Sequence, residues 1–303
     1  MRASFARPRS IDLLVALGLI LAGPAVYAAQ VQAVVSIAPH KTFVQRIGGD
    51  RVDVTVLVEP GQSPATYEPK PRQMTALSNA DVYLRIGVPF ERSLMPKIQG
   101  FTERVRIVDL REGIRLRRLG AAHEHAGEHA HGHEEHASGG EDPHTWLSPK
   151  LAMLQAATIY DALARIDPEG EKTYRANLRG FLADLADLHG RLTEALRPVR
   201  GKTFLVFHPA WGYFADAYGL EQRAVEFEGK EPSARHLAQI IDRARREDVR
   251  VIFVQPQFSQ SSARAVAREI GGAVVAIDPL AEDYIANLER VAKQVSSALG
   301  EQR

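Results

Sequence analysis

Three histidines and one aspartate hold the positions in this sequence where side chains could bind a metal ion. His40, His208 and Asp278 each come directly after a predicted buried strand, and His144 stands just before a Ser-Pro pair that opens a helix. In open parallel sheets, ligands bind beyond the carboxyl ends of the strands, so we expect these side chains to meet in one cleft. Three imidazole nitrogens and a carboxylate form a tetrahedral set that suits zinc. The predicted metal ligands are His40, His144, His208 and Asp278.

Each of these residues also has an ordinary structural interpretation. A histidine after a strand is often a hydrogen-bonded residue of a cleft, and His144 could be the last surface histidine of a low-complexity loop. Asp278 precedes Pro279, where an aspartate commonly caps a turn. The metal site is therefore a hypothesis about all four residues together.

A second group of histidines fills residues 121–141. The segment cannot bury enough apolar area to offset its chain entropy, so we expect a disordered surface loop. Imidazoles at this spacing bind borderline metals such as zinc, while a solvated linker without a role is the alternative. The six histidines are His123, His125, His129, His131, His133 and His136.

The overall composition excludes several kinds of chemistry. The 303 residues include no cysteine, which excludes disulfides, thiolate zinc sites, catalytic cysteines and N-terminal lipid attachment. A hydrophobic content of 45% and a charged content of 25% are typical of a soluble globular protein. The net charge of +1 gives no reason to expect nucleic acid as a partner.

The N-terminus has the pattern of an export signal. Arg2, Arg7 and Arg9 precede an apolar run at residues 13–22, which is too short to span a bilayer. Small residues around Ala28 then fit signal-peptidase cleavage after that residue. We expect residues 1–28 to be a signal peptide and the mature protein to work in the periplasm without a lipid anchor.

The elements that must position the four ligands alternate between strands and helices. Short apolar runs predict strands, and amphipathic segments between them predict helices. This alternation implies an α/β fold with two lobes, each with a mostly parallel sheet flanked by helices. The predicted strands lie at residues 31–37, 51–58, 81–87, 105–109, 203–207, 249–254 and 273–277.

One predicted helix is much longer than the others. Residues 171–196 carry leucines and a phenylalanine at steps of three and four, which gives one apolar stripe along about 40 Å of helix. We interpret it as a rigid linker between two lobes, the alternative being a long helix packed on one domain. The expected division is an N-terminal lobe at 29–166, a linker helix at 168–197 and a C-terminal lobe at 200–303.

Several longer motifs accompany the candidate ligands. They are Ser36-Ile37-x-Pro39, Gly61-x-Ser63-Pro64-x-x-Tyr67-Glu68-Pro69, Asp142-Pro143-His144-x-Trp146-Leu147-Ser148-Pro149, Phe207-His208-x-Ala210-x-Gly212-Tyr213-Phe214, Gly229-x-Glu231-Pro232-Ser233 and Asp278-Pro279-Leu280. Taken together, these motifs resemble the periplasmic metal-binding component of zinc and manganese ABC importers, the cluster A-I (cluster 9) solute-binding family, in its zinc type with a His-rich loop. The resemblance covers essentially the whole mature chain.

The resemblance implies two lobes joined by one rigid helix, a deep metal site between them, and delivery of the ion to an ABC permease and its ATPase in the inner membrane. We also expect a monomer. By match to the family motifs, His144 and His208 carry over as ligands and Asp278 as the carboxylate ligand.

The sequence departs from the family at one ligand. The family places its first histidine ligand after a Ser-Pro pair, and here that position is Ala65. Either the site has three protein ligands and a water, or another residue fills the gap. His40 is the first candidate, and weaker ones are Glu68, Glu231 and Gln255. Three imidazoles favour zinc over manganese or iron.

The expected function is extracytoplasmic binding of a divalent transition metal, zinc before manganese or iron, and its delivery to a permease. A zinc hydrolase is the rival from another class, because a three-ligand site keeps a position open for water. The chain has no His-Glu-x-x-His pair, nucleophile elbow or phosphate loop, so we do not expect an enzyme. A metal buffer or adhesion protein that works without a permease stays open.

Overall fold

The computed structural model describes residues 30–98, 100, 104–119, 140–226, 234–247, 249–258 and 260–300. The expected signal peptide and almost all of the histidine-rich segment lie outside these residues, as does Glu231. Within the described ranges, no helix has the length and apolar character needed to cross a membrane.

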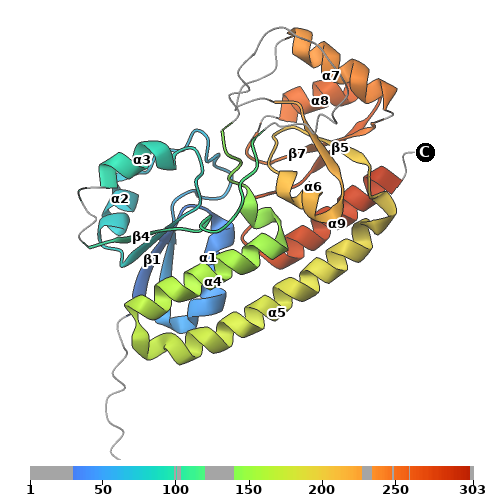
Figure 1. Ribbon diagram of the computed structural model, residues 1–303. Helices are drawn as coiled ribbons and strands as arrows, with labels where there is room; N and C mark the ends of the chain where they lie inside the picture. Colours follow the sequence, from blue (N-terminus) through green and yellow to red (C-terminus); the bar gives the residue numbers. More distant parts are fainter. Residues whose placement is uncertain are drawn as a thin grey trace, which may run out of the picture.

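The N-terminal lobe is built on a parallel four-stranded sheet with the strand order β2-β1-β3-β4 (Figure 1). The central strand β1 is valine-rich and mostly buried, as expected for a strand covered on both faces. The strands are β1 (Val31–Val35), β2 (Val52–Val56), β3 (Val82–Arg85) and β4 (Arg106–Asp109), and the helices of the lobe are α1 (Ala38–Gly48), α2 (Pro71–Ser78) and α3 (Glu91–Ile98).

The C-terminal lobe repeats this plan with a second parallel four-stranded sheet, in the order β6-β5-β7-β8. The two sheets confirm the predicted two-lobed α/β fold. The strands are β5 (Thr203–Val206), β6 (Glu221–Ala224), β7 (Val251–Val254) and β8 (Ala273–Ala276), and the helices are α6 (Gly212–Tyr218), α7 (Ala234–Arg246), α8 (Gln260–Glu269) and α9 (Tyr284–Gly300).

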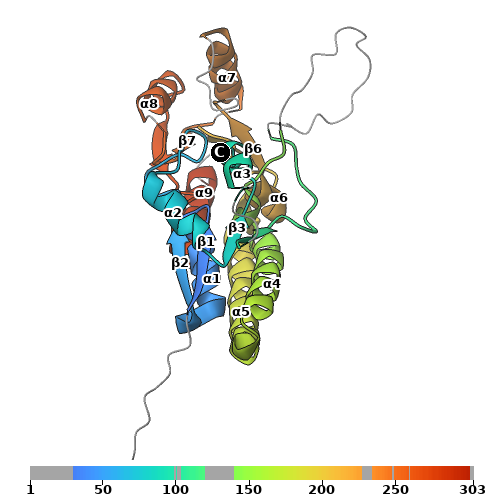
Figure 2. The same ribbon diagram turned by 90° about the vertical axis from the view of Figure 1, so that its left-hand side faces the viewer.

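Helix α4 (Pro149–Ile166) completes the first lobe, and the 26-residue α5 (Glu171–Leu196) connects the two lobes. Helix α5 packs on α1 and α4 of the first lobe and on α6 and α9 of the second, and Figures 1 and 2 show it running beside both. Its stripe of Phe181, Leu185 and Leu188 is buried. One hydrophobic core therefore extends through both lobes, and a smaller core lies under α7 and α8.

Four short 3-10 turns complete the described elements: η1 (Gly49–Arg51), η3 (Thr145–Leu147), η4 (Pro168–Gly170) and η5 (Arg197–Val199).

The sequence patterns had not indicated β6 or α3. Strand β6 reads Glu-Gln-Arg-Ala and is half-buried at the edge of its sheet, so it has no apolar run. Helix α3 contains Pro96, a residue that usually ends a helix.

Candidate metal centre

A cavity of about 400 Å³ lies between the two lobes, and both lobes contribute to its wall. The first lobe supplies Ala65, Glu141 and His144, and the second supplies His208 and Phe258. The two predicted histidine ligands that come from different lobes thus line the same cavity. Their ring centroids are 5.4 Å apart.

Contacts across the lobe boundary hold His144 in place. His144 directly precedes the η3 turn, and Trp146, two residues further on, is fully buried. The Trp146 indole Nε1 donates a 2.8 Å hydrogen bond to the carbonyl of Pro279, and the Tyr284 hydroxyl donates one of 2.6 Å to the Trp146 carbonyl. The hydroxyl of Tyr213 on α6 donates to the Asp142 carbonyl at 3.1 Å. The segment that carries His144 is therefore bound to the second lobe.

Each histidine has a buried carboxylate behind it. Asp142 Oδ1 lies 2.7 Å from His144 Nδ1, and Glu226 Oε2 lies 2.9 Å from His208 Nδ1. The carboxylates are only 3% and 2% exposed, so they accept these hydrogen bonds from the ring N–H. This arrangement fixes the tautomer of both imidazoles and leaves Nε2 as the nitrogen with a free lone pair. Metal-binding histidines are commonly supported in this way.

The surroundings of His208 keep its imidazole neutral. Burial lowers the pKa of His208 below its ordinary value of 6.5, and the hydrogen bond to Glu226 opposes that effect. The side chain of Gln255 binds both backbone groups of His208: its Oε1 accepts a hydrogen bond from His208 N, and its Nε2 donates one to His208 O. Phe258 stacks on the imidazole with the ring centroids 4.7 Å apart. Gln255 thus supports His208 rather than facing the cavity.

Asp278 lies at the edge of the cavity rather than in its wall. The next two residues, Pro279 and Leu280, line the cavity. Asp278 Oδ1 accepts hydrogen bonds of 2.9 Å from Gln257 Nε2 and from Leu280 N. The carboxylate thus caps the turn after β8, and coordination of an ion between the histidines would require it to turn.

The structure does not bring His40 to this cavity. The sequence predicted that His40 directly follows a strand. In the structure, α1 begins at Ala38, so His40 lies in the first turn of that helix. Its ring is fully buried against Phe43 and Trp146, and its Nε2 lies 3.1 Å from Gln155 Oε1. Burial lowers the pKa of His40 to about 4. Among the described residues, its Nδ1 has no hydrogen-bond partner.

The position of the missing family histidine is clear in the structure, because Ala65 lines the same cavity as the two imidazoles. Glu68 is exposed and does not contribute to the wall. Across the described ranges, no three histidine, aspartate or glutamate side chains converge closely enough to hold an ion. The cavity therefore presents a preorganised pair of histidines, with carboxylates at its periphery.

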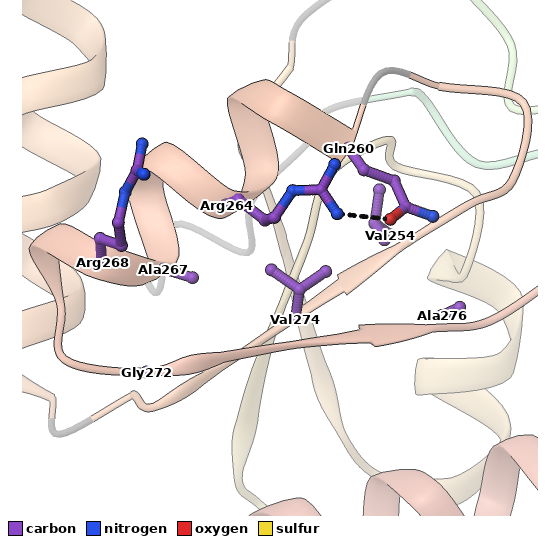
Figure 3. Close-up of a pocket in the computed structure, with 8 residues that line it drawn as sticks. All are labelled: Val254, Gln260, Arg264, Ala267, Arg268, Gly272, Val274 and Ala276. Atoms are coloured by element: carbon purple, nitrogen blue, oxygen red, sulfur yellow. Dashed lines mark hydrogen bonds between the residues drawn. The ribbon is translucent and has the colours of Figure 1, made fainter.

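A second cavity of about 400 Å³ lies between α8 and the strands β7 and β8. Figure 3 shows Arg264 and Arg268 projecting from α8, with Arg264 Nη1 donating to Gln260 Oε1 at 3.0 Å. The other lining residues are small and apolar, such as Val274 and Ala276. None of the residues that line it, all of them described, carries an imidazole or a carboxylate. The cavity between the lobes is therefore the candidate metal centre.

Two parallel α/β lobes, a long helix that packs on both, and a histidine-lined cavity between them define a solute-binding protein of the linker-helix type. A family model described as "zinc-uptake complex component A, periplasmic" matches residues 33–298. The chain belongs to this family.

Curated relatives include the zinc-binding protein AdcA of Streptococcus pyogenes serotype M3, which is 27% identical over 260 residues, 83% of this chain and 50% of that protein. The zinc-binding lipoprotein AdcA of Streptococcus pneumoniae R6 is 27% identical over 264 residues, 83% of this chain and 52% of that protein. The chain thus spans about half the length of these relatives.

Solved structures show the same fold over their whole length. A crystal structure of ZnuA is 40% identical with a TM-score of 0.80, covering 89% of this chain and 99% of that one. A zinc-bound deletion mutant of ZnuA has the same identity and TM-score, covering 90% and 100%. The laminin-binding protein of Streptococcus agalactiae, described as an adhesin with metal-transporting activity, is 26% identical with a TM-score of 0.74, covering 88% and 98%. These relatives are described as zinc-binding or metal-transporting proteins and not as enzymes.

Proposed function

We propose that this protein binds one zinc ion between its lobes, in the periplasm, and delivers it to the permease and ATPase of an ABC importer. The observation that carries the proposal is the pair of histidines from opposite lobes, His144 and His208. Each has its Nδ1 held by a buried carboxylate, so both Nε2 atoms are available to one ion.

The ligands in this proposal are His144, His208 and Asp278, with the Asp278 carboxylate turning towards the cavity when the ion enters. His40 is not among them, because it would have to leave a fully buried position. Imidazole suits zinc better than manganese, which prefers oxygen ligands. The zinc-binding relatives support the same choice.

The fold favours binding and release through small movements. Helix α5 packs on both lobes along a buried stripe, which restricts a wide hinge motion. Exchange of the ion would then depend on the segments that line the cavity. One of them carries His144 and is held to the second lobe through Tyr213 and Trp146.

A zinc titration tests the proposal. We expect the mature protein to hold one tightly bound zinc ion in competition with a chromophoric chelator, and deletion of residues 123–136 to leave that stoichiometry unchanged. His144→Ala and His208→Ala should each weaken binding at least about 100-fold, since each removes a direct ligand. The control is His189→Ala on α5, whose imidazole Nδ1 lies 3.3 Å from the Tyr218 hydroxyl, away from the cavity.

The result that would overturn the proposal is unchanged affinity in both His144→Ala and His208→Ala. Delivery is tested separately, by asking whether the intact gene restores growth under zinc limitation to a strain that lacks it. We expect that the gene with His208→Ala does not restore growth and that the gene with His189→Ala does.

A further inference from the structure

The proposed zinc site is one protein ligand short. Zinc in a closed site takes four ligands in a tetrahedron, and the proposed set supplies three. By match to the family, the fourth ligand is expected at position 65. That residue is alanine here, and its methyl group cannot coordinate a metal. Because Ala65 lines the cavity, a residue that replaces the missing ligand must also reach this cavity.

Glu141 is the carboxylate that the structure places in the wall of this cavity. The other ionisable side chains among its described lining residues are Arg92, His144 and His208. Glu141 comes three residues before His144 on the same segment.

The backbone at Glu141 is fixed against the neighbouring segment. Leu119 N donates to the Gly140 carbonyl at 2.8 Å, and Asp142 N donates to the Arg117 carbonyl at 2.8 Å. Glu141 itself forms an antiparallel bridge with Arg118 between these two bonds. The base of the side chain is therefore held at the cavity wall, and only its torsions have to change for the carboxylate to turn inward.

Little holds the Glu141 carboxylate in its present orientation. The side chain is 68% exposed, and its ion pair with Arg111 Nη1 is long, at 3.5 Å. A long ion pair whose carboxylate is exposed to solvent contributes little to stability. Arg111 also keeps a closer partner without it, because Arg111 Nε and Nη2 donate to the two oxygens of Asp109 at 3.0 and 2.8 Å. Turning Glu141 towards an ion thus leaves no unpaired charge behind.

Charge balance favours a carboxylate at the fourth position. Counted over the ion and its direct ligands alone, two neutral imidazoles and one carboxylate leave a net charge of +1. The carboxylates of Asp142 and Glu226 lie one hydrogen bond further out, and Arg92 lines the same cavity. A second carboxylate makes the zinc complex neutral, which reduces the cost of removing it from water. A water molecule in the same position would leave the charge in place.

We propose that Glu141 is the fourth zinc ligand and stands in for the histidine that is absent at Ala65. This assignment rests on the proposed function, since it assumes that His144 and His208 bind the ion. It adds a carboxylate of the first lobe to the Asp278 carboxylate of the second, so that each lobe contributes one imidazole and one carboxylate to the ion.

The test compares Glu141→Gln with Glu112→Gln, an exposed glutamate on the segment after β4 that does not line the cavity. We expect Glu141→Gln to weaken zinc binding at least about tenfold, and Glu112→Gln to bind as the unmodified protein does. Loaded with Co²⁺, the Glu141→Gln protein should show altered d–d absorption, because a change of ligand alters these bands while a more distant charge does not. Ala65→His in the Glu141→Gln background should restore the affinity.

Wild-type affinity and an unchanged cobalt spectrum in Glu141→Gln would overturn this inference. If His144→Ala and His208→Ala still lose zinc in that case, the proposed function stands with water as the fourth ligand. If those variants also bind normally, the proposed function itself fails. Equal thermal stability of the metal-free Glu141→Gln and Glu112→Gln proteins confirms that any loss of affinity does not come from misfolding.

Discussion

His144 and His208 belong to different lobes, yet their ring centroids lie 5.4 Å apart and each ring is held from behind by its own buried carboxylate. The site is thus oriented before any ion arrives. An ion that binds both rings connects the lobes directly, and its affinity depends on the groups that orient them.

The orienting carboxylates should therefore control the affinity without touching the metal. We expect Asp142→Asn and Glu226→Gln each to weaken zinc binding about 10- to 100-fold, because a neutral amide makes the imidazole a poorer ligand. Competition with a chelator measures the change. Asp184 lies on α5 and forms an exposed ion pair with Arg46, so Asp184→Asn is the matched control and should have no effect. Wild-type affinity in both carboxylate variants would mean that the two hydrogen bonds do not tune the site.

Zinc binding should depend on pH in a defined direction. A protonated imidazole cannot bind the ion, and burial places the pKa of His208 below 6.5. Affinity should stay constant from pH 8 to about 6.5, and it should fall by up to about tenfold per pH unit once the pH drops below the lowered pKa of His208.

The hydrogen bond that His208 donates to Glu226 raises the pKa of His208. In Glu226→Gln, the fall in affinity should therefore begin at a lower pH than in the unmodified protein. Titrations with a chelator at half-unit intervals of pH measure the onset, and an onset that moves upward in the variant would contradict the account.

His40 should determine part of the acid stability of the metal-free protein. Its pKa is about 4 in the folded state, against about 6.5 when the chain is unfolded. Its favourable contribution is fully present above pH 6.5 and is lost as the pH falls towards 4, because the unfolded chain then binds a proton that the folded chain does not. The difference is worth about 3 kcal/mol of unfolding free energy over that window.

Urea unfolding at several pH values compares the unmodified protein with His40→Gln, whose stability should fall less steeply between pH 6.5 and 4. The variant should still bind zinc with normal affinity, since His40 does not line the cavity. Loss of tight binding in a folded His40→Gln protein would return His40 to the list of ligands.

The sequence predicted most elements of both lobes because their strands are short apolar runs and their helices have one apolar stripe. Strand β6 escaped prediction because an edge strand with charged residues lacks that signal. His144 and His208 were placed correctly in one cavity from their motifs. For His40, the pattern placed the histidine directly after a predicted strand at residues 31–37, whereas α1 begins at Ala38 and carries His40 in its first turn, away from the cavity.

The supporting groups could not be predicted in the same way. Glu226 follows β6 and is 18 residues from His208 in the chain, so only the parallel pairing of β5 with β6 brings the two together. The Asp142 carboxylate is the exception, since an acid two residues before a candidate ligand lies within reach of its ring. Ala65 and Glu141 share a cavity because two segments of the first lobe meet there, which sequence spacing does not indicate.

The two lobes should unfold together. A single core joins them through α5, and the Tyr284 hydroxyl of the second lobe donates to the buried Trp146 carbonyl of the first. Calorimetry should show one transition, and Tyr284→Phe should lower the free energy of unfolding by about 1 to 3 kcal/mol, because it leaves that carbonyl unpaired. Tyr160→Phe is a suitable control, since its hydroxyl bonds lie at the partly exposed surface. Two separate transitions in the unmodified protein would contradict a shared core.

The most direct test of the account is a crystal structure of the zinc-loaded protein with anomalous data collected at the zinc edge. We predict one strong peak in the cavity between the lobes, with His144 Nε2 and His208 Nε2 at about 2.0 to 2.1 Å and a carboxylate oxygen of Asp278 at about 2.0 to 2.2 Å. A zinc peak elsewhere in the ordered protein, with the His144 and His208 rings left unbound, would contradict it.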